Sequence, residues 1–480
     1  MRGSTPKCID PWKAGCTLAK LNFIKSKGRI HFIGIGGHGM SSIAKVLLEM
    51  GCSVSGSDIS PSWRLEYLES LGASVYVGHD PSNVEGADIA VISAAVPQDN
   101  VEVNAAVQSG IPVMTRAEVL GELVASKYGI AVTGTHGKTT TSSMIGTMLI
   151  EAGLDPTVIL GEEAQHVPMG GRHGDGDFIV VEADEAYGSF LKIKPRIAVV
   201  TNVDDDHLDY YKDSDSINWA FATFLHSMDE SDLAVLFADD PRLMKIAKGL
   251  ALRKRLFGLE NGSLKAVNPV VRSRGYGFQV VSDGTLLGNV ELVVPGRHNI
   301  CNALASIAVG LELGIPFQQI ADSLGKFQGA KRRLEFIGEI DDILVLDDYA
   351  HHPLEIKATI SALKETYKRT LIVVFQPQRF TRTQMLFDRF AKAFSDADIV
   401  VVTDIYHKGT GEKPLPGITG EGLAEAIKKN SNPRTIFVKN INEIPETLIG
   451  LVKPNDIVVT MGAGNIDSVA RELVQRMRDK

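Results

Sequence analysis

The sequence is poor in cysteine and in aromatic residues, and it has no long apolar run. Four cysteines occur among 480 residues, and aromatic residues make up 6%. Cys8, Cys16, Cys52 and Cys301 show no zinc-ligand spacing and are too few for a disulfide framework, which favours a reducing compartment, the cytoplasm. No stretch approaches the roughly 20 apolar residues of a membrane-spanning helix, so we expect no membrane insertion.

An excess of positive charge is also missing. The 50 basic and 58 acidic residues give a net charge of −8, which argues against a nucleic-acid partner bound over the whole chain. Apolar residues make up 44% and charged residues 22%, and this composition excludes a disordered or collagen-like chain. The length predicts about three domains of roughly 150 residues each.

Short β-branched runs alternate with helical patterns through the chain, which predicts an α/β protein with parallel sheets. The pattern restarts twice. We therefore predict a Rossmann-like domain at 29–124, a P-loop-type mononucleotide-binding domain at 125–328 and a second Rossmann-like domain at 329–480.

Two segments differ from this pattern. Residues 265–295 read as antiparallel hairpins with a turn at 282–284, and they predict a small antiparallel sheet in the central domain. Residues 1–28 have no signal-peptide core, so we interpret them as a leader or flexible extension.

A glycine-rich loop follows the first predicted strand, RIHFIGI, and opens a helix. The segment Gly34-Ile35-Gly36-Gly37-His38-Gly39 satisfies G-x-G-x-x-G. Glycines let the backbone approach a diphosphate, and the helix N-terminus offers free N–H groups. Asp58 ends the next strand, where a ribose-binding acid is expected. The pattern predicts a site for a dinucleotide or another diphosphate-linked nucleotide, and a tight turn without a ligand is the alternative.

A second loop, Thr133-Gly134-Thr135-His136-Gly137-Lys138-Thr139-Thr140-Thr141, also joins a strand to a helix. Its GKT core is typical of a phosphate-binding loop, in which Lys138 reaches the β and γ oxygens and Thr139 ligates Mg²⁺. Val132 stands where the strict spacing requires glycine. The loop is therefore a variant, and a GKT turn without function is the alternative.

Acidic residues follow two later strands, at the sheet edge where ligands bind in open α/β folds. Mg²⁺ takes few carboxylates together with phosphates and water, so most of these acids are expected to be solvated. A histidine among them is either a surface or capping residue or part of the site. VVEADE carries Glu182 and Glu185, and TNVDDDHLD carries Asp204, Asp205, Asp206, His207 and Asp209.

Taken together, these segments resemble the Mur ligase family of peptidoglycan synthesis. The resemblance covers residues 29–478 and is carried, in order, by HFIGIGGHGMS, SGSD, RAEVL, VTGTHGKTTT, VEADE, VVTNVDDDHLDYY, PGRHNICNA, KRRLE, DDYAHHP, FQPQRFTRT and MGAGNI. It implies three domains that bind a UDP-sugar, Mg–ATP and an amino acid in turn. The first glycine loop would then hold a UDP diphosphate rather than a dinucleotide.

The resemblance also implies an activity, the ligation of L-alanine to the lactyl carboxylate of UDP-N-acetylmuramate with ATP and Mg²⁺. An acyl phosphate forms first, and the amine then displaces phosphate from it. Joining a murein tripeptide to the same sugar nucleotide is the nearest alternative. An NAD-dependent oxidoreductase leaves the second loop and the third domain unexplained, and the intact Lys138, Thr139, Glu182 and His207 argue against an idle binding protein.

The family's functional residues map onto the matching motifs of this sequence. The resemblance assigns Thr139, Glu182 and His207 to the metal, and Lys138, Glu182, His207, His351, His352, Arg379 and Arg382 to catalysis. It assigns Gly34, Ile35, Gly36, Gly37, His38, Gly39, Met40, Asp58 and Arg116 to the UDP-sugar. It assigns Gly134, Thr135, His136, Gly137, Lys138, Thr139, Thr140, His298, Asn299, Asn302 and Asp348 to ATP.

Several of these residues have more than one interpretation. His351 or His352 takes the proton of the attacking amine in our hypothesis. The guanidinium forks of Arg379 and Arg382 suit a carboxylate or a phosphate, although a solvated surface pair is the alternative. Helix capping is the alternative for Asn299, and for His38 as well.

Three segments depart from the family pattern. Gln378 stands where histidine is expected, Ala186 to Ser189 occupy positions where many members carry an acid, and the stretch that contains Arg172 is atypical. The last two lie where the family positions the lactyl carboxylate and the sugar. A site between three domains also predicts closure through hinges near residues 125 and 329; the oligomeric state is left open.

Overall fold

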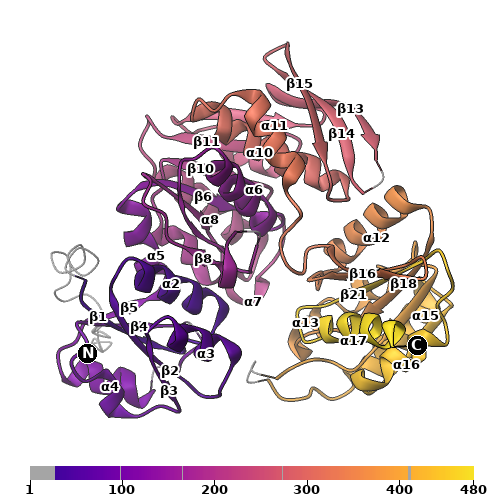
Figure 1. Cartoon of the computed structure of the whole chain (residues 1–480), viewed down its shortest axis with the longest axis horizontal. Coiled ribbons are helices and arrows are strands. Elements are labelled where there is room, and N and C mark those ends of the chain that lie inside the picture. Colours follow the sequence, from indigo (N-terminus) through magenta and orange to yellow (C-terminus); the bar gives the residue numbers. More distant parts are fainter. Residues whose placement is uncertain are drawn as a thin grey trace, which may run out of the picture.

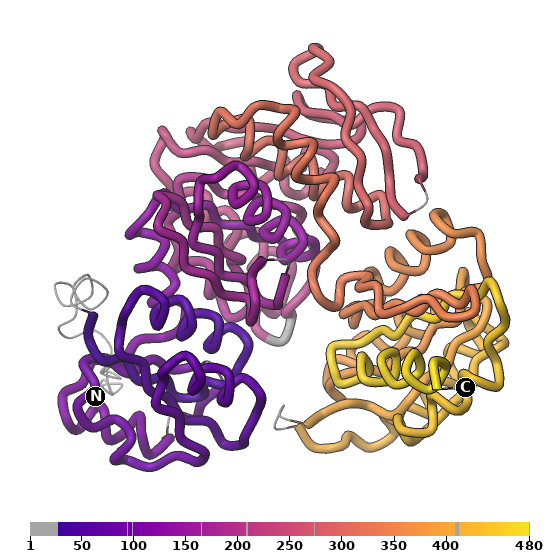
Figure 2. Tube along the Cα trace, viewed as in Figure 1, coloured from indigo at the N-terminus to yellow at the C-terminus, as the bar shows by residue number. Residues whose placement is uncertain are grey.

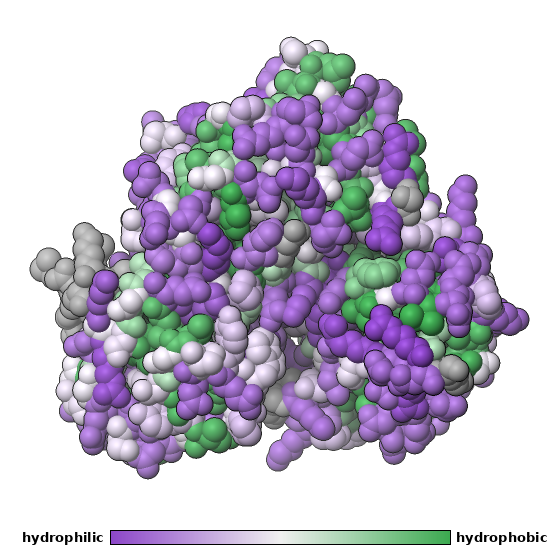
Figure 3. Space-filling view, viewed as in Figure 1, coloured by the Kyte–Doolittle hydropathy of each residue, from purple (hydrophilic) through white to green (hydrophobic). Residues whose placement is uncertain are grey.

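The computed structural model describes residues 27–479, except 94, 98, 165, 273 and 409–411 and the side chains of 208 and 209. The predictions for Cys8, Cys16, the leader and the side chain of Asp209 therefore lie outside the described residues. Three sheets form three lobes (Figure 1), and the surface is hollowed between the first lobe and the third (Figure 3). Within the described part of the chain, no helix has both the length and the apolar character to cross a membrane.

The first sheet is parallel, with the strand order β3-β2-β1-β4-β5. Alternation along β1 directs Ile30 and Phe32 into the core beneath α2, whereas Ile33 packs with residues of α4 on the other face. The strands are β1 (Arg29–Ile33), β2 (Ser53–Asp58), β3 (Ser74–Val77), β4 (Ile89–Ile92) and β5 (Val113–Thr115), and the helices are α2 (His38–Glu49), α3 (Trp63–Ser70), η1 (Pro81–Val84), α4 (Val101–Gln108) and α5 (Arg116–Ala125).

The second sheet has ten strands in the order β15-β14-β13-β12-β11-β10-β6-β9-β7-β8. Its central strands are parallel and buried on both faces, which explains their continuous β-branched runs. The strands are β6 (Tyr128–Thr133), β7 (Thr157–Ile159), β8 (Gly171–Arg172), β9 (Phe178–Glu182), β10 (Ile197–Val200), β11 (Leu233–Phe237), β12 (Arg253–Gly258), β13 (Leu264–Val271), β14 (Tyr276–Ser282) and β15 (Thr285–Leu292).

Helices cover this sheet, and α6 and α10 lie side by side in the central lobe (Figure 1). The predicted hairpins are confirmed: β13, β14 and β15 pair antiparallel, and the turn falls between Ser282 and Thr285. The helices are α6 (Lys138–Glu151), η2 (Pro168–Gly170), η3 (Ala186–Lys192), α7 (Leu208–Tyr211), α8 (Ser214–His226), α9 (Pro241–Ala247), α10 (Arg297–Glu312) and α11 (Phe317–Lys326).

The third sheet has the order β16-β17-β21-β18-β19-β20. The short β-branched runs of this domain predict its parallel strands, whereas β16, which pairs antiparallel with β17, was not predicted. The strands are β16 (Glu335–Ile340), β17 (Ile343–Asp348), β18 (Thr370–Phe375), β19 (Ile399–Val402), β20 (Thr435–Phe437) and β21 (Asp456–Met461). The helices are α12 (Pro353–Tyr367), α13 (Phe380–Met385), α14 (Phe387–Phe390), α15 (Gly420–Asn430), η4 (Ile441–Glu443), α16 (Ile444–Ile449) and α17 (Asp467–Arg478).

The chain passes once from each lobe to the next (Figure 2). Helix α5 leads from the first sheet into the second, and the segment between α11 and β16 leads from the second into the third. The domain boundaries near residues 125 and 329 stay a prediction.

Candidate active site

The second glycine loop is held rigidly at the carboxyl end of β6. Gly137 has a φ of 85°, and a Cβ there would lie 2.6 Å from Oδ1 of Asn302, so the position requires glycine. The His136 N–H donates to Oδ1 of Asn202 (2.9 Å), and Thr201 Oγ1 donates to the His136 carbonyl (2.6 Å). These contacts tie the loop to the segment that follows β10.

Lys138 begins α6 and is almost fully enclosed. Its Nζ donates to both carboxylate oxygens of Glu185 (2.7 and 2.9 Å) and to the carbonyl of Gly134 (2.7 Å). Burial disfavours the charged ammonium, but the carboxylates of Glu185 and Asp184 outweigh it and raise the pKa of Lys138. The charged Lys138 ammonium therefore lies next to the loop, in an ion pair with Glu185.

Carboxylates gather beside this loop as the sequence predicted. Thr139 Oγ1 donates to Glu182 (2.8 Å), whose other oxygen accepts from the Gly161 N–H (2.8 Å). A second group, Asp184, Glu185 and His207, brings one donor atom from each residue within 4.8 Å of the others. Two carboxylates and an imidazole suit a divalent cation. Asp184 was not singled out from the sequence, although VEADE contains it.

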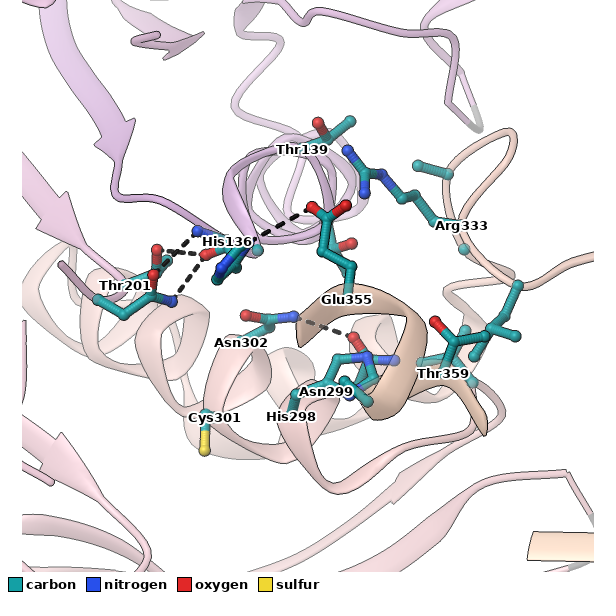
Figure 4. Close-up of a pocket in the computed structure, with 18 of the residues that line it drawn as sticks. His136, Thr139, Thr201, His298, Asn299, Cys301, Asn302, Arg333, Glu355 and Thr359 are labelled. Carbon is teal, nitrogen blue, oxygen red and sulfur yellow. Dashed lines mark hydrogen bonds and ion pairs between the residues drawn. The ribbon is translucent and has the colours of Figure 1, made fainter. Parts of the chain in front are cut away.

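A cavity of about 370 Å³ opens between the second and third sheets (Figure 4). Apolar side chains and hydrogen-bonding groups share its walls, a mixture typical of ligand sites. It brings together these predicted residues: His136, Gly137, Thr139, Thr140, His298, Asn299, Asn302 and Asp348. It also contains residues that the sequence did not indicate: Thr201, Asn202, Phe237, Phe257, Cys301, Arg333, Glu355 and Thr359.

Asn299 and Asn302 lie on α10 and face this cavity (Figure 4). The Nδ2 of Asn299 donates to the Pro295 carbonyl (2.6 Å), and its Oδ1 accepts from Nδ2 of Asn302 (3.0 Å). The N-cap of α10 is Gly296, with no side-chain cap. The interpretation of Asn299 as the helix cap is therefore wrong, because its side chain binds a carbonyl that precedes the helix.

Glu355 connects the second glycine loop to the third domain. Its Oε1 lies 3.4 Å from Nδ1 of His136, and its Oε2 accepts from the N–H groups of His351 (3.0 Å) and His352 (3.1 Å). His352 caps α12, and its ring centroid is 5.9 Å from that of His136. Burial opposes protonation of His136, but the Glu355 carboxylate raises its pKa overall.

Asp348 ends β17 at the edge of the cavity, and Tyr349 follows the strand. Asp348 accepts from the N–H groups of Leu334 and Ala350 (2.8 Å each), and burial raises its pKa to about 6. The guanidinium carbons of Arg332 and Arg333 lie 5.1 and 5.3 Å from the Tyr349 ring centroid, a cation–π arrangement. Asp348 thus lines the larger cavity, and its assignment to ATP stays a prediction, while Tyr349 packs against Arg332 and Arg333.

A second, smaller cavity of about 50 Å³ adjoins this region. It lies between the acidic turn after β10 and helix α13. Arg379 donates through Nε to Glu412 (2.7 Å), and Arg382 donates through Nη1 to Oε1 of Gln378 (3.1 Å). Gln378, the departure from the family pattern, therefore orients Arg382. The lining residues are Asp205, Asp206, His207, His352, Arg379, Thr381, Arg382, Met385 and Leu386.

The adjacent histidines His351 and His352 differ in the ring nitrogen that carries the proton. His351 Nδ1 lies 2.9 Å from the Tyr349 carbonyl and must donate to it, which leaves the lone pair on Nε2. His352 Nδ1 accepts from the Leu354 N–H (3.4 Å), so its proton is on Nε2. Burial lowers the pKa of both imidazoles, that of His351 to about 4, so both are neutral near pH 7. His351 is the candidate proton acceptor because its lone pair is on Nε2.

The first glycine loop is anchored by the neighbouring strand. The N–H groups of Gly34 and Ile35 donate to the Ser57 carbonyl (2.8 and 3.0 Å), and the Gly36 N–H donates to Asp58 (2.9 Å). Arg116 lies over the start of α2, since a Cβ on Gly39 would be 2.5 Å from its Nη1. Ile35 and Met40 of this segment are buried in the core.

His38 projects from this loop toward the middle domain. Its Nε2 is 3.6 Å from Oε1 of Glu162. It is the first residue of α2, whose N-cap is Gly37 with no side-chain hydrogen bond, so the interpretation of His38 as a cap is wrong. The side chain faces the space between two domains instead.

The two other departures from the family pattern, at Arg172 and at Ala186 to Ser189, make their contacts within the central domain. Arg172 donates to the Pro156 carbonyl (2.7 Å) and to Asp155 (2.5 Å), so its guanidinium is engaged within its own domain. The segment Ala186 to Ser189 opens η3, where Tyr187 has a φ of 55° and is 57% exposed. Its ring makes an edge contact with Tyr210 at 5.6 Å.

Family models match each of the three lobes. The Mur ligase family catalytic domain matches residues 29–128, the Mur ligase middle domain matches 132–310, and the Mur ligase glutamate ligase domain matches 332–464. The chain belongs to the Mur ligase family. This confirms the resemblance that its motifs indicate.

Curated relatives of this Mur ligase share nearly its whole length. The UDP-N-acetylmuramate–L-alanine ligase of Geotalea uraniireducens is 48% identical over 94% of this chain and 98% of its own. The enzyme of that name from Pelotomaculum thermopropionicum is 43% identical with the same coverage. A crystal structure of the UDP-N-acetylmuramate–alanine ligase of Thermotoga maritima is 30% identical, with a TM-score of 0.80 over 94% of this chain and 99% of that one.

A murein peptide ligase from Psychrobacter arcticus has the same fold. It is 24% identical, with a TM-score of 0.68 over 94% of this chain and 99% of that chain. At this identity the likeness concerns the fold alone.

Proposed function

We propose that this Mur ligase joins L-alanine to the lactyl carboxylate of UDP-N-acetylmuramate, in the cytoplasm, with conversion of ATP to ADP and phosphate. The names of the curated relatives, at 43% and 48% identity, support this substrate pair. The observation that carries the proposal is the pair of adjoining cavities, one beside the phosphate-binding loop and one beside an arginine pair.

ATP occupies the larger cavity in this proposal. Adenosine lies among the residues of α10 and the third domain, and the phosphates lie at the loop that begins α6. Asn299, Asn302 and Asp348 bind the nucleoside, and the loop amides bind the phosphates. Phosphate oxygens compete with Glu185 for Lys138, so nucleotide binding releases this carboxylate from its ion pair.

A divalent cation fits beside the loop once Glu185 is released from Lys138. Asp184, Glu185 and His207 provide oxygen and nitrogen donors within 4.8 Å, and Thr139 with Glu182 provides a neighbouring oxygen pair. When bound there, Mg²⁺ supplies charge neutralisation for the transferring phosphoryl group. Lys138 and the loop N–H groups stabilise the same charge, because they are fixed before the reaction starts.

The lactyl carboxylate attacks the γ-phosphorus, ADP leaves, and an acyl phosphate forms. The amine of L-alanine attacks the acyl carbon, and phosphate leaves the tetrahedral adduct. Arg382, held by Gln378, and Arg379 bind the alanine carboxylate in the smaller cavity. His351 accepts the amine proton at Nε2. The UDP diphosphate lies on the first glycine loop, with Asp58 and Arg116 beside it.

The test is release of phosphate from Mg–ATP in the presence of UDP-N-acetylmuramate, with single amino acids added in turn. We expect release to require both the sugar nucleotide and L-alanine, with an amide product by mass spectrometry. Release with a murein tripeptide but not with L-alanine would assign the chain to peptide recycling. No release under any of these conditions would refute the ligase proposal.

A further inference from the structure

A buried carboxylate lies in the first domain, away from both cavities. Glu102, the second residue of α4, has a fully buried side chain. It accepts from Ser57 Oγ (2.5 Å) and from Asn83 Nδ2 (2.6 Å). His79 Nδ1 lies 3.0 Å away and His31 Nε2 lies 3.8 Å away. One acid therefore connects β1, β2, the segment after β3 and η1.

The hydrogen bonds keep this carboxylate ionised. Burial alone would raise its pKa, but the nearby imidazole of His31 and the hydrogen-bond partners Ser57, Asn83 and His79 outweigh burial and lower the pKa of Glu102 to about 2. Buried charges are retained only where such partners exist. None of the proposed steps of the reaction uses this group.

The network ends at the residue that holds the first glycine loop. Alternation along β2 places the side chain of Ser57 on the face of Glu102 and that of Asp58 on the opposite face. The Ser57 carbonyl accepts from Gly34 and Ile35, and Asp58 accepts from Gly36. Ser57 is thus tied to the carboxylate through its side chain and to the loop through its backbone.

The structure assigns Glu102 as a positioning residue for the diphosphate loop, which acts through Ser57 and His79. By fixing the carboxyl ends of β2 and β3, it holds the loop in place, so that the N–H groups of His38 and Gly39 at the start of α2 stay in position for a diphosphate. A loop oriented before binding loses less conformational entropy when the ligand arrives. The inference rests on the proposed function, because it needs a UDP group at this loop.

The test compares Glu102→Gln with the wild-type chain. This change removes the charge and keeps the shape of the side chain. Calorimetric titration with UDP measures the affinity of the loop for the ligand directly. We expect UDP to bind at least about tenfold more weakly, as for the loss of hydrogen bonds to a charged group. The KM for UDP-N-acetylmuramate should rise in parallel, while kcat and the KM for ATP stay within about twofold of wild type. Glu85→Gln, an exposed acid of the same domain, should change none of these values.

Ser57→Ala provides a milder second variant, because it removes only the hydroxyl. If Glu102 acts through Ser57, the effects of the two substitutions overlap. The double variant should then lose less UDP affinity than the two single fold losses multiplied together. Unchanged UDP affinity in both single variants would overturn the inference while leaving the proposed function intact. An equal rise in the KM for ATP would also overturn it, since a general loss of structure would explain that. If the wild-type chain did not bind UDP, both proposals would fail.

Discussion

Lys138 and Glu185 form an ion pair that serves both the stability of the chain and its proposed reaction. Lys138 is 13% exposed and Glu185 3%, so neither charge is well solvated without the other. Breaking a buried pair by removing one partner leaves an uncompensated charge, whereas removing both does not. The two substitutions therefore have different consequences for stability and for catalysis.

We expect Lys138→Met to lower the free energy of unfolding by about 3–5 kcal/mol, the usual cost of leaving one buried charge unpaired. The double variant Lys138→Met/Glu185→Gln should recover much of this loss in urea denaturation. Phosphate release should fall about 10²–10³-fold in both variants, because stabilisation of the transferring phosphoryl group is lost in each. Full turnover in the double variant would contradict the role of Lys138.

Protonation of Asp348 should make the free energy of unfolding depend on pH, and a single substitution can separate this effect from those of other groups. Its folded pKa of about 6 lies above the unfolded value of 3.8, so the folded state binds more protons than the unfolded state between these two values. The free energy of unfolding should therefore fall as pH rises from about 4 to 6, by about 3 kcal/mol, relative to Asp348→Asn. Denaturation of both proteins across this range measures the difference. If the unfolding free energies of the two proteins changed with pH in parallel, the pKa of Asp348 would not be raised in the folded state.

Helix α12 has a function beyond packing, since its first turn carries the contact to the second glycine loop. His352 caps the helix, Pro353 occupies the first position, and Glu355 completes a capping box. The Glu355 side chain also reaches His136. One acid therefore stabilises the helix and links two domains.

We expect Glu355→Ala to lower the free energy of unfolding by about 1–2 kcal/mol through the lost cap. The KM for ATP should rise several-fold, because His136 loses its partner at the loop. Lys357→Ala lies on the exposed face of the same helix and should leave the KM for ATP unchanged. An unchanged KM in Glu355→Ala would show that this contact does not assist nucleotide binding.

For the whole molecule, polar contacts bridge the lobes on both sides of the central domain, and one of them joins Lys45 Nζ of α2 to the Gly171 carbonyl (2.7 Å). His38 faces Glu162 between the first and second lobes, and His136 faces Glu355 between the second and third. Domain closure around an acyl phosphate would exclude water, which otherwise hydrolyses it. The contacts indicate where the closing surfaces meet.

Small-angle scattering should show a smaller radius of gyration when UDP-N-acetylmuramate and a non-hydrolysable ATP analogue are both present. Each ligand alone should give a smaller change, because each bridges fewer lobes. The variant Glu355→Gln should shift the ligand-free protein toward a larger radius. Profiles that do not change with either ligand would contradict closure through hinges near residues 125 and 329.

Local patterns identified most of the elements, but not all. The parallel strands are continuous apolar runs, and both glycine loops have spacings imposed by backbone geometry. Strand β16 was missed because Asp341 and Asp342 join it to β17 with φ values of 49° and 62°. Neither residue of this tight turn is glycine, so the usual sequence signal of a hairpin is missing. Adjacent aspartates between two apolar runs are nevertheless a signal for such a turn.

The sequence by itself determined the α/β class, the two glycine loops, the acids after β9 and β10 and the Mur ligase family, because these depend on residues close together along the chain. Only the tertiary structure decided that Glu355 meets His136 and that Glu102 supports the first loop. In each case the partners lie on separate elements, far apart along the chain. Their geometry depends on how the sheets and helices pack, and a pattern of neighbouring residues carries no record of that packing.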